Sequence, residues 1–175
     1  MENIEIRESA RDDLVSIGAL YPVAFPDEDL LPLVKALLRQ GPVTLSLVAV
    51  VGASLVGHVI FTSCGITGSG DTVALLGPLA VAPAWQRQGV GRALVRAGTG
   101  RMEAAGATRV CVLGDPAYYG RLGFAVEAHI APPYRLPAEW RTAWRSIGLG
   151  DTEHLPDRCK LITPQAWMQP SLWTS

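Results

Sequence analysis

The stretch from Leu75 to Phe124 reads LLGPLAVAPAWQRQGVGRALVRAGTGRMEAAGATRVCVLGDPAYYGRLGF, and it decides the expected fold. It opens with the apolar run Leu75–Val81, which predicts a buried strand. Pro83 ends this run, because proline has no N–H group to donate to a sheet. The stretch therefore begins with a strand that stops abruptly at a polar segment.

Two glycines, Gly89 and Gly91, follow the polar segment and lead into apolar residues at roughly helical spacing. Gly106 stands where the glycine after a helix C-terminus belongs. The first N–H groups of a helix are unpaired and its dipole is positive there, so a strand, a glycine turn and a helix in succession predict an anion-binding loop. Glycine also lets a phosphate approach the backbone closely.

Spacing separates three kinds of phosphate loop. A P-loop requires Lys and Ser or Thr after its last glycine, but Arg92-Ala93 follow Gly91. A dinucleotide fingerprint requires a third glycine where Leu94 stands. The remaining pattern, Gln86-x-x-Gly89-x-Gly91 after a strand, resembles the coenzyme A pyrophosphate loop of the GNAT superfamily of acetyl-CoA-dependent N-acetyltransferases.

A second block, Asp115–Phe124, strengthens this resemblance. It is similar to the tyrosine-bearing helix of the family, whose Tyr-x-x-x-Gly-Phe signature is met by Tyr119, Gly123 and Phe124. The family often has an asparagine early in this block, and Asp115 stands near that place. The resemblance implies an α/β (α+β) fold with a mixed, mostly antiparallel sheet of six to seven strands, splayed at the cofactor site, and about four helices.

The chain of 175 residues is long enough for one domain, and we expect a single domain over 1–175 with its motifs at 75–124 and an undecided C-terminal segment at 131–175. The apolar run 43–61 is read as two strands around a turn at 52–54 rather than a membrane span. Expected strands are Ile4–Arg7, Thr44–Val51, Leu55–Cys64, Val73–Val81, a strand around Val110 parallel to it, Trp140–Ile147 and Arg158–Thr163. Expected helices run from an N-cap at Ser9 to Tyr21-Pro22 and from Asp27 to Arg39, and Gly65–Asp71 is an expected turn.

Composition limits the partners. The net charge is −1 and the pI is near 6.3, so we expect neither nucleic acid nor an anionic membrane as a partner. The first eight residues lack the apolar region of a signal peptide, and three widely spaced cysteines indicate neither disulfides nor a metal site. We expect a cytoplasmic protein, and a homodimer is left open.

The resemblance assigns roles to individual residues. Tyr119 is expected to protonate the departing CoA thiolate, and Glu28 is the candidate general base. The main chain near Val81 is expected to polarise the thioester carbonyl. The expected cofactor-binding residues are Leu79, Ala80, Val81, Arg87, Gln88, Gly89, Val90, Gly91, Arg92, Ala93, Asp115 and Tyr119.

Simpler interpretations stay open at several of these positions. The two arginines could be solvated surface residues, Tyr119 a packing residue, and Glu28 a helix N-terminal charge. His58 on an apolar strand is more typical of a hydrogen-bonded core histidine, and Tyr118 is expected to be structural.

The expected function is acetyl-CoA-dependent N-acetylation of a primary amine, by direct attack in a ternary complex. The alternatives are a non-catalytic acyl-CoA sensor and an acyltransferase that uses a longer acyl-CoA. The acceptor, a small-molecule or peptide amine, is not identified by the sequence.

Overall fold

The computed structural model describes residues 3–150 and 155–174. These residues form two compact units. Unit 1 lies within Met1–Phe61 and Gly77–Arg101, and unit 2 lies within Thr62–Leu76 and Met102–Ser175. Two long strands pass from one unit into the other, and the expectation of a single domain over 1–175 stays a prediction.

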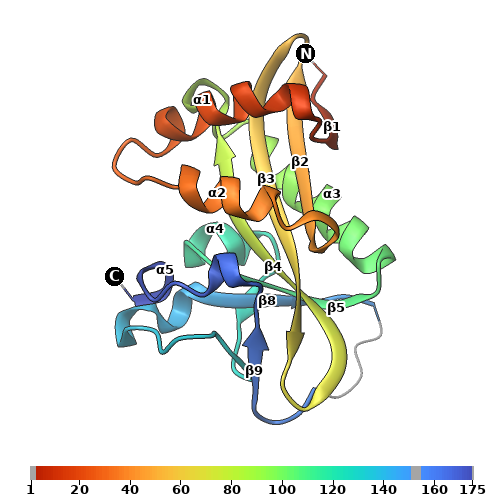
Figure 1. Cartoon of the computed structure of the whole chain (residues 1–175), viewed down its shortest axis with the longest axis vertical. Helices are drawn as coiled ribbons and strands as arrows, with labels where there is room; N and C mark the ends of the chain where they lie inside the picture. Colours follow the sequence, from red (N-terminus) through yellow and green to blue (C-terminus); the bar gives the residue numbers. More distant parts are fainter. Residues whose placement is uncertain (1–2, 151–154, 175) are drawn as a thin grey trace. The chain divides into compact units, whose positions relative to one another are not determined.

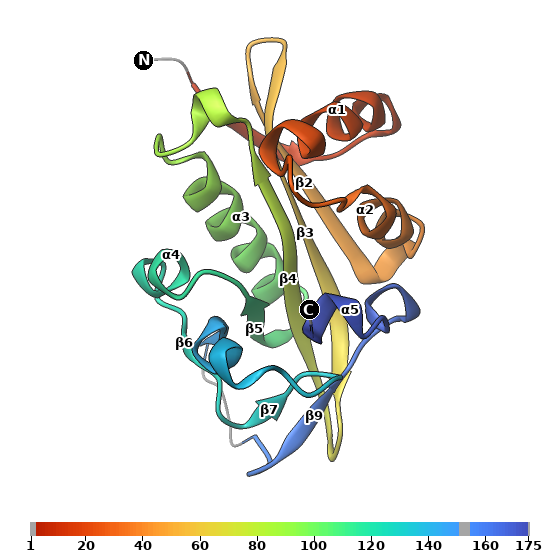
Figure 2. The same cartoon turned by 90° about the vertical axis from the view of Figure 1, so that its left-hand side faces the viewer.

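Unit 1 is a sheet with helices on both faces. The order of its strands is β1-β2-β3-β4, and β1 pairs with β2 antiparallel from Glu5↔Val50 to Glu8↔Leu47. Helices α1 and α2 cover one face of these strands and α3 covers the other (Figures 1 and 2). The elements are β1 (Glu5–Glu8), α1 (Leu14–Ala24), α2 (Leu31–Leu38), β2 (Thr44–Val51), β3 (Ser54–Ile66), β4 (Ser69–Val81) and α3 (Val90–Ala104).

Small residues let α3 lie close to β3. A Cβ added at Gly57 on β3 would come within 2.9 Å of the side chains of Val90 and Leu94 on α3. A Cβ at Gly98 would overlap the ring of Phe61, which is fully buried. Because interiors are close-packed, these contacts fix where α3 begins relative to the strand it covers.

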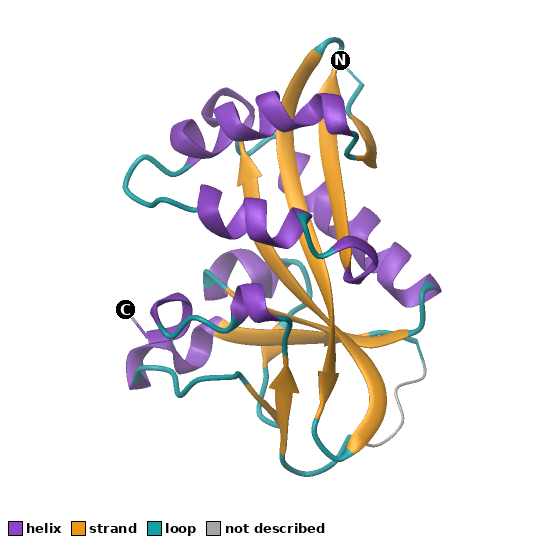
Figure 3. Cartoon of the chain, viewed as in Figure 1, coloured by secondary structure: helices purple, strands orange, loops and turns teal. Residues whose placement is uncertain are grey.

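Unit 2 carries the second half of the sheet. Strand β4 pairs with β5 in parallel from Thr72↔Ala107 to Leu76↔Val112, as predicted, and β8 then pairs with β5 antiparallel. The tryptophans of the C-terminal segment pack together, with ring centroids 5.7 Å apart for Trp144 and Trp173. The elements are β5 (Ala107–Leu113), α4 (Pro116–Arg121), β6 (Ala125–Val126), β7 (Ile130–Ala131), β8 (Trp144–Gly148), β9 (Cys159–Ile162) and α5 (Ser171–Thr174) (Figure 3).

The expected fold class is confirmed. The strand order β1-β2-β3-β4-β5-β8-β6 gives seven strands, and β9 adds to it by pairing with β3 and β7. Parallel pairing is found for β4 with β5 and for β7 with β9, within an otherwise mostly antiparallel arrangement. The described residues hold nine strands and five α-helices, slightly more than expected.

The first helix differs from the expectation at both ends. Ser9 is not its N-cap, because the Ser9 hydroxyl donates to Ser46 Oγ at 2.7 Å. A short 3-10 turn, Arg11–Asp13, precedes α1 instead, and Asp13 accepts from the Ala10 N–H at 2.6 Å. Pro22 does not end the helix, which continues to Ala24. In this last turn proline removes only one helical hydrogen bond.

Three other expected boundaries were wrong. Helix α2 starts at Leu31 rather than Asp27, since a proline in its first turn favours that start, so residues 27–29 precede the helix. The expected turn at 65–71 shrinks to Thr67-Gly68, because the end of β3 pairs with β9 at Gly65↔Ile162. The first half of the expected strand at 140–147 lies in a 3-10 helix, Ala138–Ala143.

The long apolar run at 43–61 forms most of β2 and β3, as expected. Within the described part of the chain no helix has the length and apolar character needed to cross a membrane.

Candidate active site

The expected phosphate loop joins β4 to α3 in unit 1. Two glutamine side chains of the loop form hydrogen bonds to nearby backbone carbonyl groups. Gln86 Nε2 donates to the carbonyl of Val81 at 3.1 Å, and Gln88 Nε2 donates to the carbonyl of Ala84 at 2.9 Å. Gln88, which was expected to contact the cofactor, therefore already has a structural role in shaping the loop.

Two residues of this loop have positive φ, which is common in anion-binding turns. Arg87 has φ of +62° and Gly89 has φ of +86°, so both lie in the left-handed region. For a residue other than glycine this costs on the order of 1 kcal/mol, and such strain is concentrated at functional sites. Left-handed residues beside right-handed ones turn successive N–H groups toward one side, which is the geometry of anion-binding nests.

The start of α3 leaves amide donors available. The first amide of this region to bond within the helix is that of Ala93, which donates to the Gly89 carbonyl at 3.0 Å. Among the described residues the N–H groups of Val90, Gly91 and Arg92 have no acceptor. Three free donors at the positive end of a 15-residue helix are the groups that a pyrophosphate would accept from.

The side chains of Arg87 and Arg92 are exposed, and neither forms an ion pair with a described carboxylate. They are free to contact a phosphate, and that role stays a prediction.

The end of β4 offers backbone groups at the edge of unit 1. The Ala82 N–H donates to the Val56 carbonyl of β3 at 2.8 Å. Backbone groups alternate between the two sides of a strand, so those of Leu79 and Val81 point away from β3, whereas those of Ala80 point toward it. The Gln86 bond to the Val81 carbonyl agrees with this orientation. Leu79 and Val81 can therefore supply the strand edge that was expected for the pantetheine amides.

Tyr119 lies in unit 2 on α4, and its ring is held on three sides. A Cβ at Gly114 would overlap the ring, so glycine is needed where β5 leads into α4. Tyr118 and Phe124 pack edge-on against it, with centroids 5.0 and 5.6 Å away. Sequence reasoning missed Gly114, whose only signal was a glycine between an apolar strand and the helix-capping Asp115.

The Tyr119 hydroxyl makes no hydrogen bond to any residue that the structure describes, although the residue is only 8% exposed. Burial raises the pKa of this phenol, and the neighbouring Tyr118 and Asp115 raise it further. The group therefore keeps its proton at neutral pH and can donate a hydrogen bond.

The other expected site residues have distinct surroundings. Asp115 is the N-cap of α4 and accepts from the Ala117 N–H at 2.9 Å, so one of its oxygens is engaged. Glu28 is exposed in the connection between α1 and α2, which removes the interpretation as a charge in the first turn of a helix. His58 is a core histidine, as expected, hydrogen-bonded to Tyr21 and Ser46.

The structure thus brings the loop and the end of β4 together in unit 1, and Asp115 and Tyr119 together in unit 2. Glu28 also belongs to unit 1. No group of three or more His, Cys, Asp or Glu side chains that could hold a metal occurs in residues 3–150 and 155–174.

Comparison with known proteins points to one family. The sequence model described as Acetyltransferase (GNAT) family matches residues 6–124. The uncharacterized N-acetyltransferase YjhQ of Escherichia coli K12 is 38% identical over 105 residues, covering 57% of this chain but only 58% of YjhQ. The uncharacterized N-acetyltransferase YhbS of the same strain is 34% identical over 125 residues, covering 71% of this chain and 75% of YhbS.

Solved structures agree. The crystal structure of E. coli YhbS in complex with CoA superposes with a TM-score of 0.84 at 26% identity, covering 97% of this chain and 94% of that one. A GNAT acetyltransferase from Brucella melitensis in complex with acetyl-CoA gives 0.74 at 27% identity, covering 95% and 99%. The similarity at this level confirms the splayed, mixed sheet that the sequence motifs implied.

Proposed function

Because this chain belongs to the GNAT acetyltransferase family, we propose that it moves an acetyl group from acetyl-CoA to a primary amine by direct attack in a ternary complex. The observation that carries the proposal is the loop at the start of α3, with its left-handed Arg87 and three amide donors that have no acceptor among the described residues. Relatives whose structures contain CoA or acetyl-CoA support the same substrate.

Different residues of this chain bind different parts of acetyl-CoA. The amides of Val90–Arg92 donate hydrogen bonds to the pyrophosphate oxygens, and Arg87 and Arg92 add charge-assisted contacts to the same oxygens. The backbone edge at Leu79 and Val81 pairs with the pantetheine amides. The Val81 N–H stabilises the negative charge that develops on the thioester oxygen.

The reaction needs two proton transfers. The amine nitrogen attacks the thioester carbon, the C–S bond breaks, and the sulfur takes up a proton while the amine loses one. A phenol whose pKa is raised is a weaker acid than a thiol, so Tyr119 acts by a hydrogen bond that strengthens as charge builds on sulfur. Glu28 accepts the proton from the amine, directly or through water.

The test is the release of free CoA thiol from acetyl-CoA, with and without a panel of amines that includes polyamines, aminoglycosides, amino acids and lysine peptides. The proposal predicts that at least one amine accelerates release well above the rate in its absence. Tight binding of acetyl-CoA with no acceleration by any amine would favour the non-catalytic sensor. Turnover only with a longer acyl-CoA would show that the donor is that acyl-CoA and not acetyl-CoA.

A further inference from the structure

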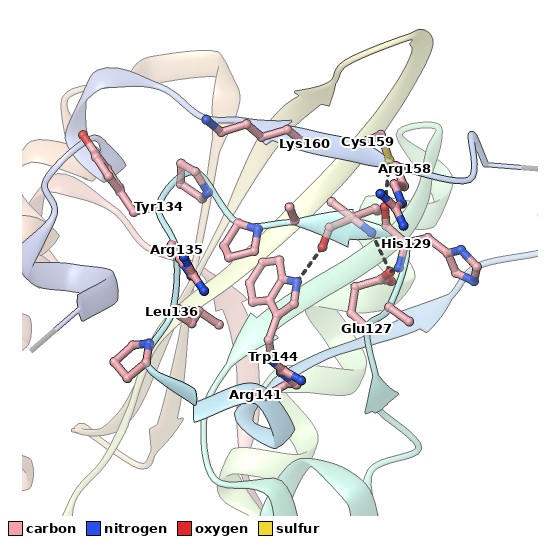
Figure 4. Close-up of a pocket in the computed structure, with 16 residues that line it drawn as sticks. Glu127, His129, Tyr134, Arg135, Leu136, Arg141, Trp144, Arg158, Cys159 and Lys160 are labelled. Atoms are coloured by element: carbon pink, nitrogen blue, oxygen red, sulfur yellow. Dashed lines mark hydrogen bonds between the residues drawn. The ribbon is translucent and has the colours of Figure 1, made fainter. Parts of the chain in front are cut away.

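A pocket in unit 2 is lined by none of the residues assigned to acetyl transfer. It has a volume of about 600 Å³. We call it the C-terminal pocket, and it is lined by the segment 127–137, by Arg141 and Trp144, and by the segment 158–160 (Figure 4). This volume is in the range of about 300–1,000 Å³ that is usual for sites of small organic ligands.

Four cations surround the C-terminal pocket. Lys160 lies on β9 and Arg158 directly precedes that strand, and Arg135 and Arg141 come from the segment that faces it in Figure 4. All four are exposed, and none of them forms an ion pair with a carboxylate in the described part of the chain. Such a concentration of unpaired positive charge is unexpected in a protein whose net charge is −1.

The single carboxylate that lines the pocket is already fully engaged. Glu127 accepts from the amides of His129 and Ile130 at 2.6 and 2.8 Å and from Ser146 Oγ at 2.6 Å, and it lies 3.4 Å from Arg109 Nη1. Its side chain is 1% exposed. Glu127 therefore pairs with Arg109, and among the described residues it forms no ion pair with any of the four cations.

The walls of the pocket are held in place before any ligand binds. Trp144 Nε1 donates to the Ile130 carbonyl at 2.7 Å, and the Cys159 N–H donates to the His129 carbonyl at 3.0 Å. Pro132, Pro133 and Pro137 restrict the backbone between β7 and β8. A preorganised pocket loses little conformational entropy on binding.

We propose that the C-terminal pocket binds a small organic anion that carries two or more carboxylate or phosphate groups on an apolar body. Three guanidinium groups and one ammonium provide the charge, and the planar guanidinium is the preferred partner of both acids. The prolines, Leu136 and the Trp144 ring provide the apolar wall. The same charge repels a cationic amine, so the expected ligand of this pocket is opposite in charge to a protonated amine.

The test uses isothermal titration of the whole protein with benzene-1,3,5-tricarboxylate and, as a second probe, benzene-1,3-diyl bisphosphate, which carries two phosphate groups on the same ring. Benzene-1,3,5-tricarboxamide is the uncharged control of the same shape. Saturating CoA is present, so that the cofactor loop is not available to the probes. The proposal predicts that an acidic probe binds, that the tricarboxamide does not, and that affinity falls as salt is raised. The tighter of the two probes identifies the preferred acid.

Arg158→Gln/Lys160→Gln removes two pocket cations, and Lys35→Gln/Arg39→Gln makes the same charge change on the exposed end of α2. The pocket variant should weaken probe binding by at least about tenfold, and the control should leave it unchanged. Equal weakening by both variants would show nonspecific attraction and overturn the proposal. It would also be overturned if neither acid bound better than the tricarboxamide, or if a probe bound without CoA and was displaced when CoA was added. None of these outcomes depends on acetyl transfer.

Discussion

At Tyr119, the ring and the hydroxyl have different surroundings. The ring packs against Gly114, Tyr118 and Phe124, while the hydroxyl has no partner among the described residues. A hydroxyl that stabilised the fold would be hydrogen-bonded within it. The hydroxyl is therefore available to donate a hydrogen bond to a bound ligand, and its role in catalysis stays a prediction.

Replacing Tyr119 by Phe keeps the ring and removes only the donor. We expect kcat with a competent amine to fall by about 10²-fold, with the Kd for acetyl-CoA nearly unchanged, because the hydrogen bond strengthens only as the thiolate departs. Steady-state kinetics and titration with acetyl-CoA measure the two quantities. Tyr118→Phe on the same helix is the control and should retain kcat. Wild-type turnover in Tyr119→Phe would show that Tyr119 is a packing residue.

His58 makes the stability of the protein sensitive to acid. Burial lowers its pKa to about 4, although Asp13 nearby acts in the opposite direction. The unfolded chain takes up this proton near pH ~6.5, whereas the native protein does so only near pH 4. The free energy of unfolding should therefore be unaffected by His58 above pH ~6.5 and should fall by up to about 3 kcal/mol as pH decreases to about 4.

Urea unfolding at a series of pH values checks this expectation. His58→Gln alters the hydrogen bonds to Tyr21 and Ser46, so its free energy of unfolding should be lower than that of the wild type at neutral pH. Because glutamine does not titrate, this free energy should change much less than that of the wild type between pH ~6.5 and about 4. The stability that depends on Asp13, whose pKa is about 2, is lost at lower pH, below about 3.8. Parallel curves for the two proteins would contradict the role given to His58.

At the scale of elements, the turn before α3 depends on the left-handed conformation of Gly89. A Cβ at this position would meet no atom within 4 Å, so the cost of a substitution comes from the backbone. Gly89→Val should displace the loop and its amide donors and weaken acetyl-CoA binding, measured by titration. Gly41→Val is a matched control, because Gly41 has φ of +63° and equally open surroundings. Equal affinity in the two variants would place the phosphates elsewhere.

Elements with strong local signals were predicted well from the sequence. β2 has the predicted bounds, Thr44–Val51, because turn signals on both sides of the apolar run define where the strand begins and ends. The helix after Gly89 and the tyrosine-bearing helix after Asp115 were found by their motifs, and the parallel partner of β4 followed from the intervening helix.

The errors occur where distant contacts override local signals. β3 extends through Gly65 because β9 provides hydrogen-bond partners from nearly a hundred positions later in the sequence. Ser9 looked like a helix cap but bonds to Ser46 on β2. The cations of the C-terminal pocket are spread from Arg135 to Lys160, so no sequence motif joins them and only the fold brings them to one pocket.

At the scale of the whole molecule, ligand binding should appear as stability. A ligand that binds only the folded protein stabilises it by RT ln(1 + [L]/Kd), so acetyl-CoA at ~100 times its Kd should add about 2.7 kcal/mol. This is visible as a higher melting temperature in calorimetry. NAD and ATP, which lack the pantetheine arm, should raise it much less. Equal shifts from the three ligands would contradict the assignment of the loop to acetyl-CoA.

The fate of the acetyl group tests the central claim most directly. The amine that accelerates thiol release is incubated with isotopically labelled acetyl-CoA and the protein, and the products are analysed by mass spectrometry. We predict one labelled N-acetyl group on the amine for each thiol released, with transfer strongly reduced in Tyr119→Phe. Thiol release accompanied by labelled acetate and unmodified amine would show hydrolysis instead, and would contradict the proposal that this chain is an N-acetyltransferase.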